Sequence, residues 1–240
     1  MKILIVRHGE PDYAHDTLTE KGWKEAELLA SRLSQLDIKD FYVSPLGRAK
    51  DTASLTLKKM GRKAKTCDWL KEFPPRIHRP DHEGVDCAWD WMPEDWTTRP
   101  QFYDVEHWYE DPIMKEGQVK ETYLNVTKQF DALLKEHGYV RKGNVYEVIH
   151  GNHDTIVLFC HFGVECVLLS RLLNVSPMIL WHGFVAAPSS VTTICSEERK
   201  EGTASFRISA FGDTSHLYAG QEEPSFMARY CECYGDKTMH

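Results

Sequence analysis

Lys2-Ile-Leu-Ile-Val-Arg-His-Gly-Glu10 opens the chain with an apolar stretch that ends in charged and polar residues. Residues 2–7 are rich in β-branched side chains and do not alternate with polar ones, which is typical of a parallel strand buried on both faces. In open α/β sheets, ligands bind beyond the carboxyl ends of the strands. Arg7 and His8 are therefore expected where a ligand would lie.

Strands and helices alternate along most of the remaining sequence. Thr19 is placed to cap a helix, and Ser44-Pro45 is expected to open another, with Ser44 as N-cap and an end at Gly61. Helices are also expected over 116–138 and directly after His161. The further strands are expected at 40–44, 64–70, 145–149, 155–160, 190–196 and 204–211. This alternation predicts an α/β fold with a mostly parallel central sheet flanked by helices on both faces.

Residues 73–115 break the alternation. They are rich in Pro, Trp, Asp and His, and show neither a helical nor a strand period. The stretch is too long and too aromatic for an ordinary loop, so we interpret it as a lid-like insertion in a single domain spanning 1–240. Its aromatic residues are expected mainly to form a small core of their own. The alternative is an aromatic wall against the organic part of a substrate.

The composition indicates which kinds of partner and which cellular compartment to expect. The chain has 240 residues and a net charge of -7, and it contains no Lys/Arg-rich run, so we expect no nucleic-acid partner. The apolar runs are too short to span a membrane. Scattered cysteines inside apolar stretches, such as Cys160 and Cys166, favour a reduced, cytoplasmic protein. The sequence leaves the oligomeric state open; an apolar patch on the insertion would favour a homodimer.

Two histidines and two arginines are predicted to converge at one edge of the sheet. Arg7 and His8 end the first strand, Arg48 follows the strand at 40–44, and His161 follows the most hydrophobic strand. Buried positive charge is costly without an anion, and Arg binds phosphate oxygens bidentately. The helix start near Arg48 should add N–H groups. A neutral imidazole is a nucleophile toward phosphorus, and neighbouring arginines should lower its pKa. The pattern predicts a phosphate site.

These motifs, taken in order, resemble the histidine phosphatase superfamily, which is phosphoglycerate mutase-like. Each motif alone is weak, but the ordered set covers most of the chain outside 73–115. The matching blocks are Arg7-His8-Gly9-Glu10, Leu18-Thr-Glu-Lys-Gly22, Ser44-Pro-Leu-Gly-Arg-Ala-Lys-Asp-Thr-Ala53, His161-Phe-Gly163 and Gly212-Asp-Thr-Ser-His-Leu217.

The resemblance implies a role for each candidate residue. His8 would become phosphohistidine, and Arg7, Arg48 and His161 would surround the transferred phosphoryl group. Phe162 stands where the acid-phosphatase branch has its proton-donating Asp. The other branch uses a Glu after the third strand, which implies Glu72 here. Because Phe-Pro-Pro follows Glu72 instead of the usual continuation, Asp81 and Glu83 of the insertion remain alternatives.

The function expected from this resemblance is hydrolysis of a small phosphorylated metabolite, with no metal or cofactor. Two alternatives stay open. One is a phosphotransferase of the phosphoglycerate mutase type, and the other is a phospho-ligand binding module without turnover. Two groups look like metal ligands on paper, but neither matches a known ligand spacing. They are His78, Asp81, His82 and Glu83, and His150, His153 and Asp154.

Overall fold

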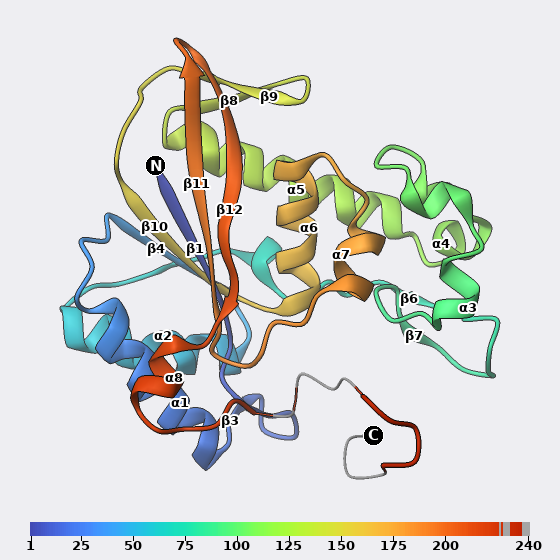
Figure 1. Ribbon diagram of the computed structural model, residues 1–240, viewed down its shortest axis with the longest axis horizontal. Coiled ribbons are helices and arrows are strands. Elements are labelled where there is room, and N and C mark those ends of the chain that lie inside the picture. The colour runs from blue at the N-terminus through green and yellow to red at the C-terminus, as the bar shows by residue number, and fades with distance from the viewer. Residues whose placement is uncertain (226, 228–230, 237–240) are drawn as a thin grey trace.

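A computed structural model describes residues 1–225, 227 and 231–236. Its centre is an eight-stranded sheet in the order β5-β4-β10-β1-β11-β12-β9-β8, with helices packed on both faces (Figure 1). These strands are β1 (Lys2–Arg7), β4 (Asp40–Val43), β5 (Lys65–Thr66), β8 (Tyr139–Lys142), β9 (Val145–Val148), β10 (Thr155–Cys160), β11 (Val191–Lys200) and β12 (Thr203–Asp213). Two short pairs lie outside it: β2 (Pro11–Asp12) with β3 (Thr17–Leu18), and β6 (Arg76–Ile77) with β7 (Asp86–Cys87).

The helices connect the strands and cover the sheet. The α-helices are α1 (Glu20–Leu33), α2 (Gly47–Met60), α3 (Pro93–Trp96), α4 (Pro112–Glu116), α5 (Val119–Glu136), α6 (Phe162–Leu173), α7 (Pro177–Gly183) and α8 (Ser215–Ala219). The 3₁₀ helices are η1 (Asp68–Leu70), η2 (Pro100–Tyr103) and η3 (Trp108–Glu110). As predicted, the Thr19 side chain caps α1 by accepting from Gly22 N. Among the described residues, no helix is long and apolar enough to cross a membrane.

The expected α/β architecture is confirmed, but the sheet is mixed and not mostly parallel. Strands β5, β4, β10 and β1 run parallel, whereas β11, β12, β9 and β8 pair antiparallel. For the pairs β11–β12 and β8–β9 the physical reason is the length of the connections. Only two residues join β11 to β12, with Gly202 at φ +75°, and two join β8 to β9, with Gly143 at φ +60°. Such tight turns can only make hairpins.

The central strand β1 divides the core into two layers. Ile3 and Ile5 belong to the apolar cluster that contains α5, α6 and α7, while Leu4 and Val6 belong to the cluster on the α1 and α2 side. All four side chains are almost completely buried. This is the arrangement expected of a strand covered on both faces, and it explains the lack of polar alternation.

Several expected boundaries differ from the observed ones. The strand predicted over 64–70 is reduced to β5, because the chain turns into η1 immediately afterwards. The helix predicted over 116–138 is α5, which begins at Val119 because Gln118 before it adopts φ +51°; the short α4 ends at Glu116. The strands predicted at 145–149 and 155–160 are not neighbours: β9 pairs with β8, which the sequence pattern did not indicate, and β10 lies between β4 and β1.

The segment 73–115 is built from short helices and the β6–β7 hairpin, and it packs beside α7 (Figure 1). Trp91, Phe102 and Trp108 are buried, as the core interpretation of its aromatic residues predicts. They do not form a separate core, however. Trp108 packs edge-on against Trp181 of α7 and lies in the same apolar cluster as α5 and α6.

Candidate active site

The carboxyl ends of three neighbouring parallel strands meet at one edge of the sheet. His8 follows β1, His161 follows β10 and Ser44 follows β4. Backbone bonds hold them together, because His8 N donates to Cys160 O at 3.0 Å and Ser44 N donates to Phe159 O at 2.9 Å. The convergence predicted from the sequence is therefore observed for both histidines.

His8 is buried, with 2% of its surface exposed. Its Nδ1 lies 2.7 Å from Gly9 O, and since a carbonyl only accepts, Nδ1 carries the proton and Nε2 keeps its lone pair. The pKa of His8 is lowered to about 3, chiefly by burial and then by the charges of Arg7 and Arg48. The lowered pKa was expected, but burial is a larger cause than the arginines. His8 is thus held as a neutral imidazole with a free nitrogen.

His161 lies next to His8, with 5.0 Å between the ring centroids. Its Nε2 is 2.8 Å from Ser44 Oγ, which also accepts from Leu46 N at 3.3 Å. The prediction that Ser44 caps a helix is wrong. The helix α2 begins three residues later with Leu46 as N-cap, because Ser44 is engaged with His161. Burial is the main cause that holds the pKa of His161 well below its ordinary value.

The two predicted arginines flank the histidines from different elements. Arg7 ends β1, and its Nη1 donates to Ala186 O. Arg48 lies in the first turn of α2, and its Nη1 donates to Asp16 Oδ1 at 2.7 Å. The other Asp16 oxygen accepts from Gly47 N at 2.7 Å. Gly47 begins α2, so one of the backbone N–H groups that we expected to bind phosphate is already bonded to Asp16. Asp16 thereby orients both Arg48 and the helix start.

Several polar atoms of this site are buried and lack a hydrogen-bond partner among the described residues. They are Arg7 Nε, Arg48 Nε and His161 Nδ1. Buried donors are normally satisfied, and leaving one unpaired costs about 1–3 kcal/mol. Three such nitrogens around His8 indicate a site that an oxyanion would complete.

Glu72 follows η1 and comes close to the start of α6. Its Oε1 accepts from Phe73 N at 2.8 Å and from Val164 N at 3.1 Å, two residues beyond Phe162. Burial raises the pKa of Glu72, although the backbone donors and Arg7 oppose the shift. Of the two alternatives, Asp81 pairs with Arg79 and Glu83 is exposed. Glu72 is therefore the carboxyl that the structure brings to the predicted site.

Three residues at or near this edge were not predicted as functional. Asp16 holds Arg48, as described above. Glu165 is a fully buried carboxyl in α6 that interacts electrostatically with Arg7, and burial raises its pKa to about 7. Trp89 of the insertion reaches Gly163, which follows the His161-Phe162 pair. No local pattern marks any of them, because each acts through residues distant in sequence.

The two groups of residues that look like metal ligands in the sequence are not arranged as metal sites. Within residues 1–225, 227 and 231–236, no group of three or more His, Cys, Asp or Glu side chains is arranged to hold a metal ion. His78 pairs with Glu116, and His82 pairs with Asp86 in an exposed part of the insertion.

Known proteins resemble this chain in sequence. The family model of the histidine phosphatase superfamily (branch 1) matches residues 3–208. Phosphoserine phosphatase 1 of Hydrogenobacter thermophilus is 29% identical over 209 residues, which cover 83% of this chain and 89% of that protein. The mitochondrial serine/threonine-protein phosphatase Pgam5 of Caenorhabditis briggsae is 37% identical over 221 residues. That match covers 90% of this chain but 64% of Pgam5, so the chain spans less than two thirds of this relative's length.

Solved structures share the fold. A phosphoserine phosphatase of Entamoeba histolytica, crystallised with phosphoserine, superimposes with a TM-score of 0.59. The alignment covers 90% of this chain and 98% of that one at 20% sequence identity, which shows a common fold.

Proposed function

We propose that this chain, which belongs to the histidine phosphatase superfamily (branch 1), hydrolyses phosphomonoesters through a phosphohistidine at His8. The observation that carries the proposal is the state of His8. Its Nδ1 is bonded to Gly9 O and its pKa is lowered, so Nε2 is unprotonated and ready to attack. An imidazole held in this tautomer is an activated nucleophile.

In the first step, His8 Nε2 attacks phosphorus and the bond to the leaving oxygen breaks. Arg7, Arg48 and His161 supply donors to the phosphoryl oxygens, using the buried nitrogens that lack a hydrogen-bond partner among the described residues. Preorganised donors of this kind contribute ~10²–10³-fold each to the rate. Glu72 gives its proton to the leaving oxygen, and its raised pKa favours the acid form that this step needs.

In the second step, water attacks the phosphohistidine and releases inorganic phosphate. Glu72, now a carboxylate, takes the proton of the water, and His8 returns to its neutral form. Every residue in this cycle ends as it began, so the site needs no metal or cofactor to balance the reaction. We further propose that residues 1–240 form one catalytic domain, with 73–115 as its lid.

The comparisons support two candidate substrate classes. Small phosphorylated metabolites are supported by the likeness to a phosphoserine phosphatase over 83% of this chain. A phosphoserine or phosphothreonine side chain in a protein is a second candidate, because the match to Pgam5 is longer and more identical. Both are alkyl phosphates, and their alkoxide leaving groups need the proton from Glu72.

Two rival functions use the same residues. A mutase must keep the phosphohistidine from water and needs basic contacts for a second acidic group. An idle binding module would hold phosphate without turnover. The unprotonated His8, together with the raised pKa of Glu72 near Arg7, favours turnover over simple binding.

The first test is hydrolysis of para-nitrophenyl phosphate by the wild type and by His8→Ala, each with and without EDTA. The proposal predicts EDTA-resistant activity that His8→Ala abolishes. Screening then compares free phosphoserine with a phosphoserine peptide. Loss of activity with EDTA would contradict metal independence, and activity in His8→Ala would contradict the nucleophile.

A further inference from the structure

The insertion returns to the active site at Trp89. Gly163 has so little space around it that an added Cβ would stand 2.6 Å from Glu72 Oε1 and 2.9 Å from Trp89 Nε1. The Glu72 carboxyl and the Trp89 indole are therefore close neighbours above Gly163, at the start of α6. Trp89 also packs edge-on against Phe162, with 6.4 Å between ring centroids.

Backbone bonds explain why Trp89 reaches this position. The β6–β7 hairpin pairs Arg76 with Cys87, which turns the chain back toward Glu72. Ala88 N then donates to Pro75 O at 3.0 Å. The indole Nε1 itself donates to Phe73 O at 3.3 Å, one residue beyond Glu72. Two contacts thus tie this part of the insertion to the segment that carries Glu72.

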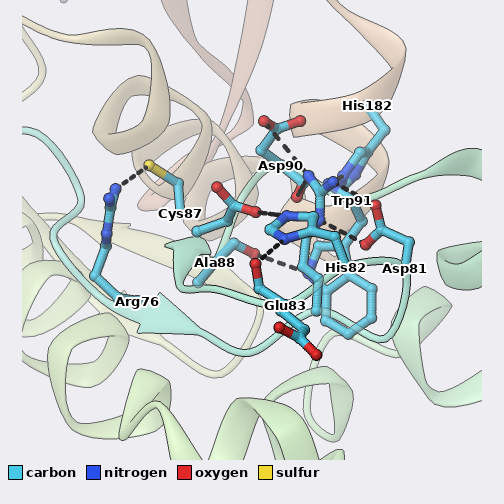
Figure 2. A network of polar contacts seen from close by, with 11 residues as sticks. Arg76, Asp81, His82, Glu83, Cys87, Ala88, Asp90, Trp91 and His182 are labelled. Carbon is cyan, nitrogen blue, oxygen red and sulfur yellow. Dashed lines mark hydrogen bonds and ion pairs between the residues drawn. The ribbon is translucent and has the colours of Figure 1, made fainter.

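The residues after Trp89 are fixed as well (Figure 2). Arg79 Nη1 donates to Asp90 O at 2.7 Å, and Arg79 is held by a two-bond pair with Asp81. Trp91 N donates to His182 Nε2 at 3.1 Å. The lowered pKa of His182, caused mainly by burial, favours the neutral form that this bond requires. The insertion is anchored on both sides of Trp89, so the indole is held in place.

We propose that Trp89 is a positioning residue that covers the Glu72 carboxyl against solvent and holds it at the start of α6. The inference rests on the proposed role of Glu72 as proton donor. The indole fills space beside the carboxyl that water would otherwise occupy, and desolvation of a carboxyl favours its protonated form, which is the form that a leaving alkoxide requires. Trp89 would act through Glu72, and not by touching the phosphoryl group.

Leaving groups of different basicity test this inference. Para-nitrophenolate leaves as a stable anion and needs little help from an acid, whereas the alkoxide of phosphoserine needs a proton. We expect Trp89→Ala to lower kcat on phosphoserine roughly tenfold at pH 8, which is a part of the ~10²–10⁴-fold that a general acid contributes. At pH 4, below the ordinary carboxyl pKa of 4.5, even an exposed Glu72 is mostly protonated, so the loss should shrink. The kcat on para-nitrophenyl phosphate should stay within about twofold at both pH values.

Two variants make the result specific. Trp89→Phe keeps an apolar ring over Glu72 and should retain most of the activity on phosphoserine. Trp23→Ala removes an indole of α1 that is 38% exposed and lies outside the insertion, and it should keep the wild-type ratio of the two substrates. An equal loss on both substrates in Trp89→Ala, or the same change of ratio in Trp23→Ala, would overturn the assignment.

Glu72→Gln separates this inference from the proposed function. If Glu72→Gln selectively loses phosphoserine hydrolysis but Trp89→Ala does not, the proton donor stands and the role of Trp89 is refuted. If Glu72→Gln affects both substrates equally, Glu72 is not the proton donor, and the role of Trp89 falls with it. A third, separate result would refute the proposed function itself: a wild type without phosphatase activity, or activity that survives in His8→Ala.

Discussion

Replacing Glu165 with Gln should stabilise the protein, and the gain should depend on pH. Glu165 has 1% of its surface exposed, and its Oε1 has no hydrogen-bond partner among the described residues. Burial raises its pKa from 4.5 to about 7, against the opposing effects of a bond to Thr192 and the charge of Arg7. Gln has nearly the shape of the protonated carboxyl but cannot ionise.

The sign and size of the effect of Glu165 on the free energy of unfolding follow from proton linkage. Below pH 4.5 the carboxyl is protonated in both the folded and the unfolded chain, so it adds no penalty. Between pH 4.5 and 7 the unfolded chain ionises while the folded chain keeps the proton, and the penalty grows as the pH rises. Above pH 7 it stays constant at about 3 kcal/mol, since each unit of pKa corresponds to about 1.4 kcal/mol.

Thermal unfolding of wild type and Glu165→Gln at pH 4.5 and pH 8 measures this difference. At pH 8 the variant should melt roughly 5–10 °C higher, and at pH 4.5 the two melting temperatures should nearly coincide. Glu147→Gln, an exposed position on β9, is the control and should show no such dependence. A gain of equal size at both pH values, or a destabilised variant at pH 8, would refute the reasoning.

Three further predictions follow from single contacts. Ser44→Ala removes the bond to His161 Nε2 and should lower kcat about tenfold or more, and the buried nitrogen left unpaired should lower the free energy of unfolding by about 1–3 kcal/mol; an unchanged kcat would contradict the orienting role. Thr19→Ala removes the cap of α1 and should lower the free energy of unfolding by about 1 kcal/mol in urea titrations, with the kinetics unchanged. Because the pKa of His8 is lowered to about 3, its imidazole NMR signals should not titrate between pH 5 and 8; a midpoint near 6.5 would contradict the buried neutral form.

The residues that follow buried strands could be predicted from the sequence. The apolar strands β1 and β10 are visible as hydrophobic runs, and Arg7, His8 and His161 stand at their ends. Parallel strands place such ends at the same edge, which makes the convergence predictable from the chain alone. Glu72 could be located only through the family resemblance, which implies a Glu after the third strand; of the strand predicted over 64–70 only β5 forms, and η1 follows it.

The remaining parts of the site depend on tertiary contacts that no local pattern shows. Ser44-Pro45 has the local signature of a helix start, but its hydroxyl bonds to His161, which lies 117 residues away. Asp16 caps α2 across 31 residues, so the observed start of that helix lacks a local cap. Trp89 is one of several similar indoles in its segment, and only the returning hairpin distinguishes it.

The strand β8 and the mixed sheet were missed for a related reason. Tyr139–Lys142 is short and carries two basic residues, so its hydrophobic pattern is weak. It forms because the turn at Gly143 brings it against β9. The direction of pairing is decided by the turn and not by the strand sequence, and the hydrophobic runs alone could not show it.

The phosphohistidine itself is the most direct test of the mechanism. Wild type and His8→Ala are mixed with radiolabelled phosphoserine, or with the best substrate from the screen, and quenched in base within the first turnovers. The label is then mapped by mass spectrometry of the peptides. The mechanism predicts a base-stable, acid-labile phosphate on His8 that appears before inorganic phosphate accumulates and is absent from His8→Ala. Turnover without label on His8, or label on another residue, would contradict it.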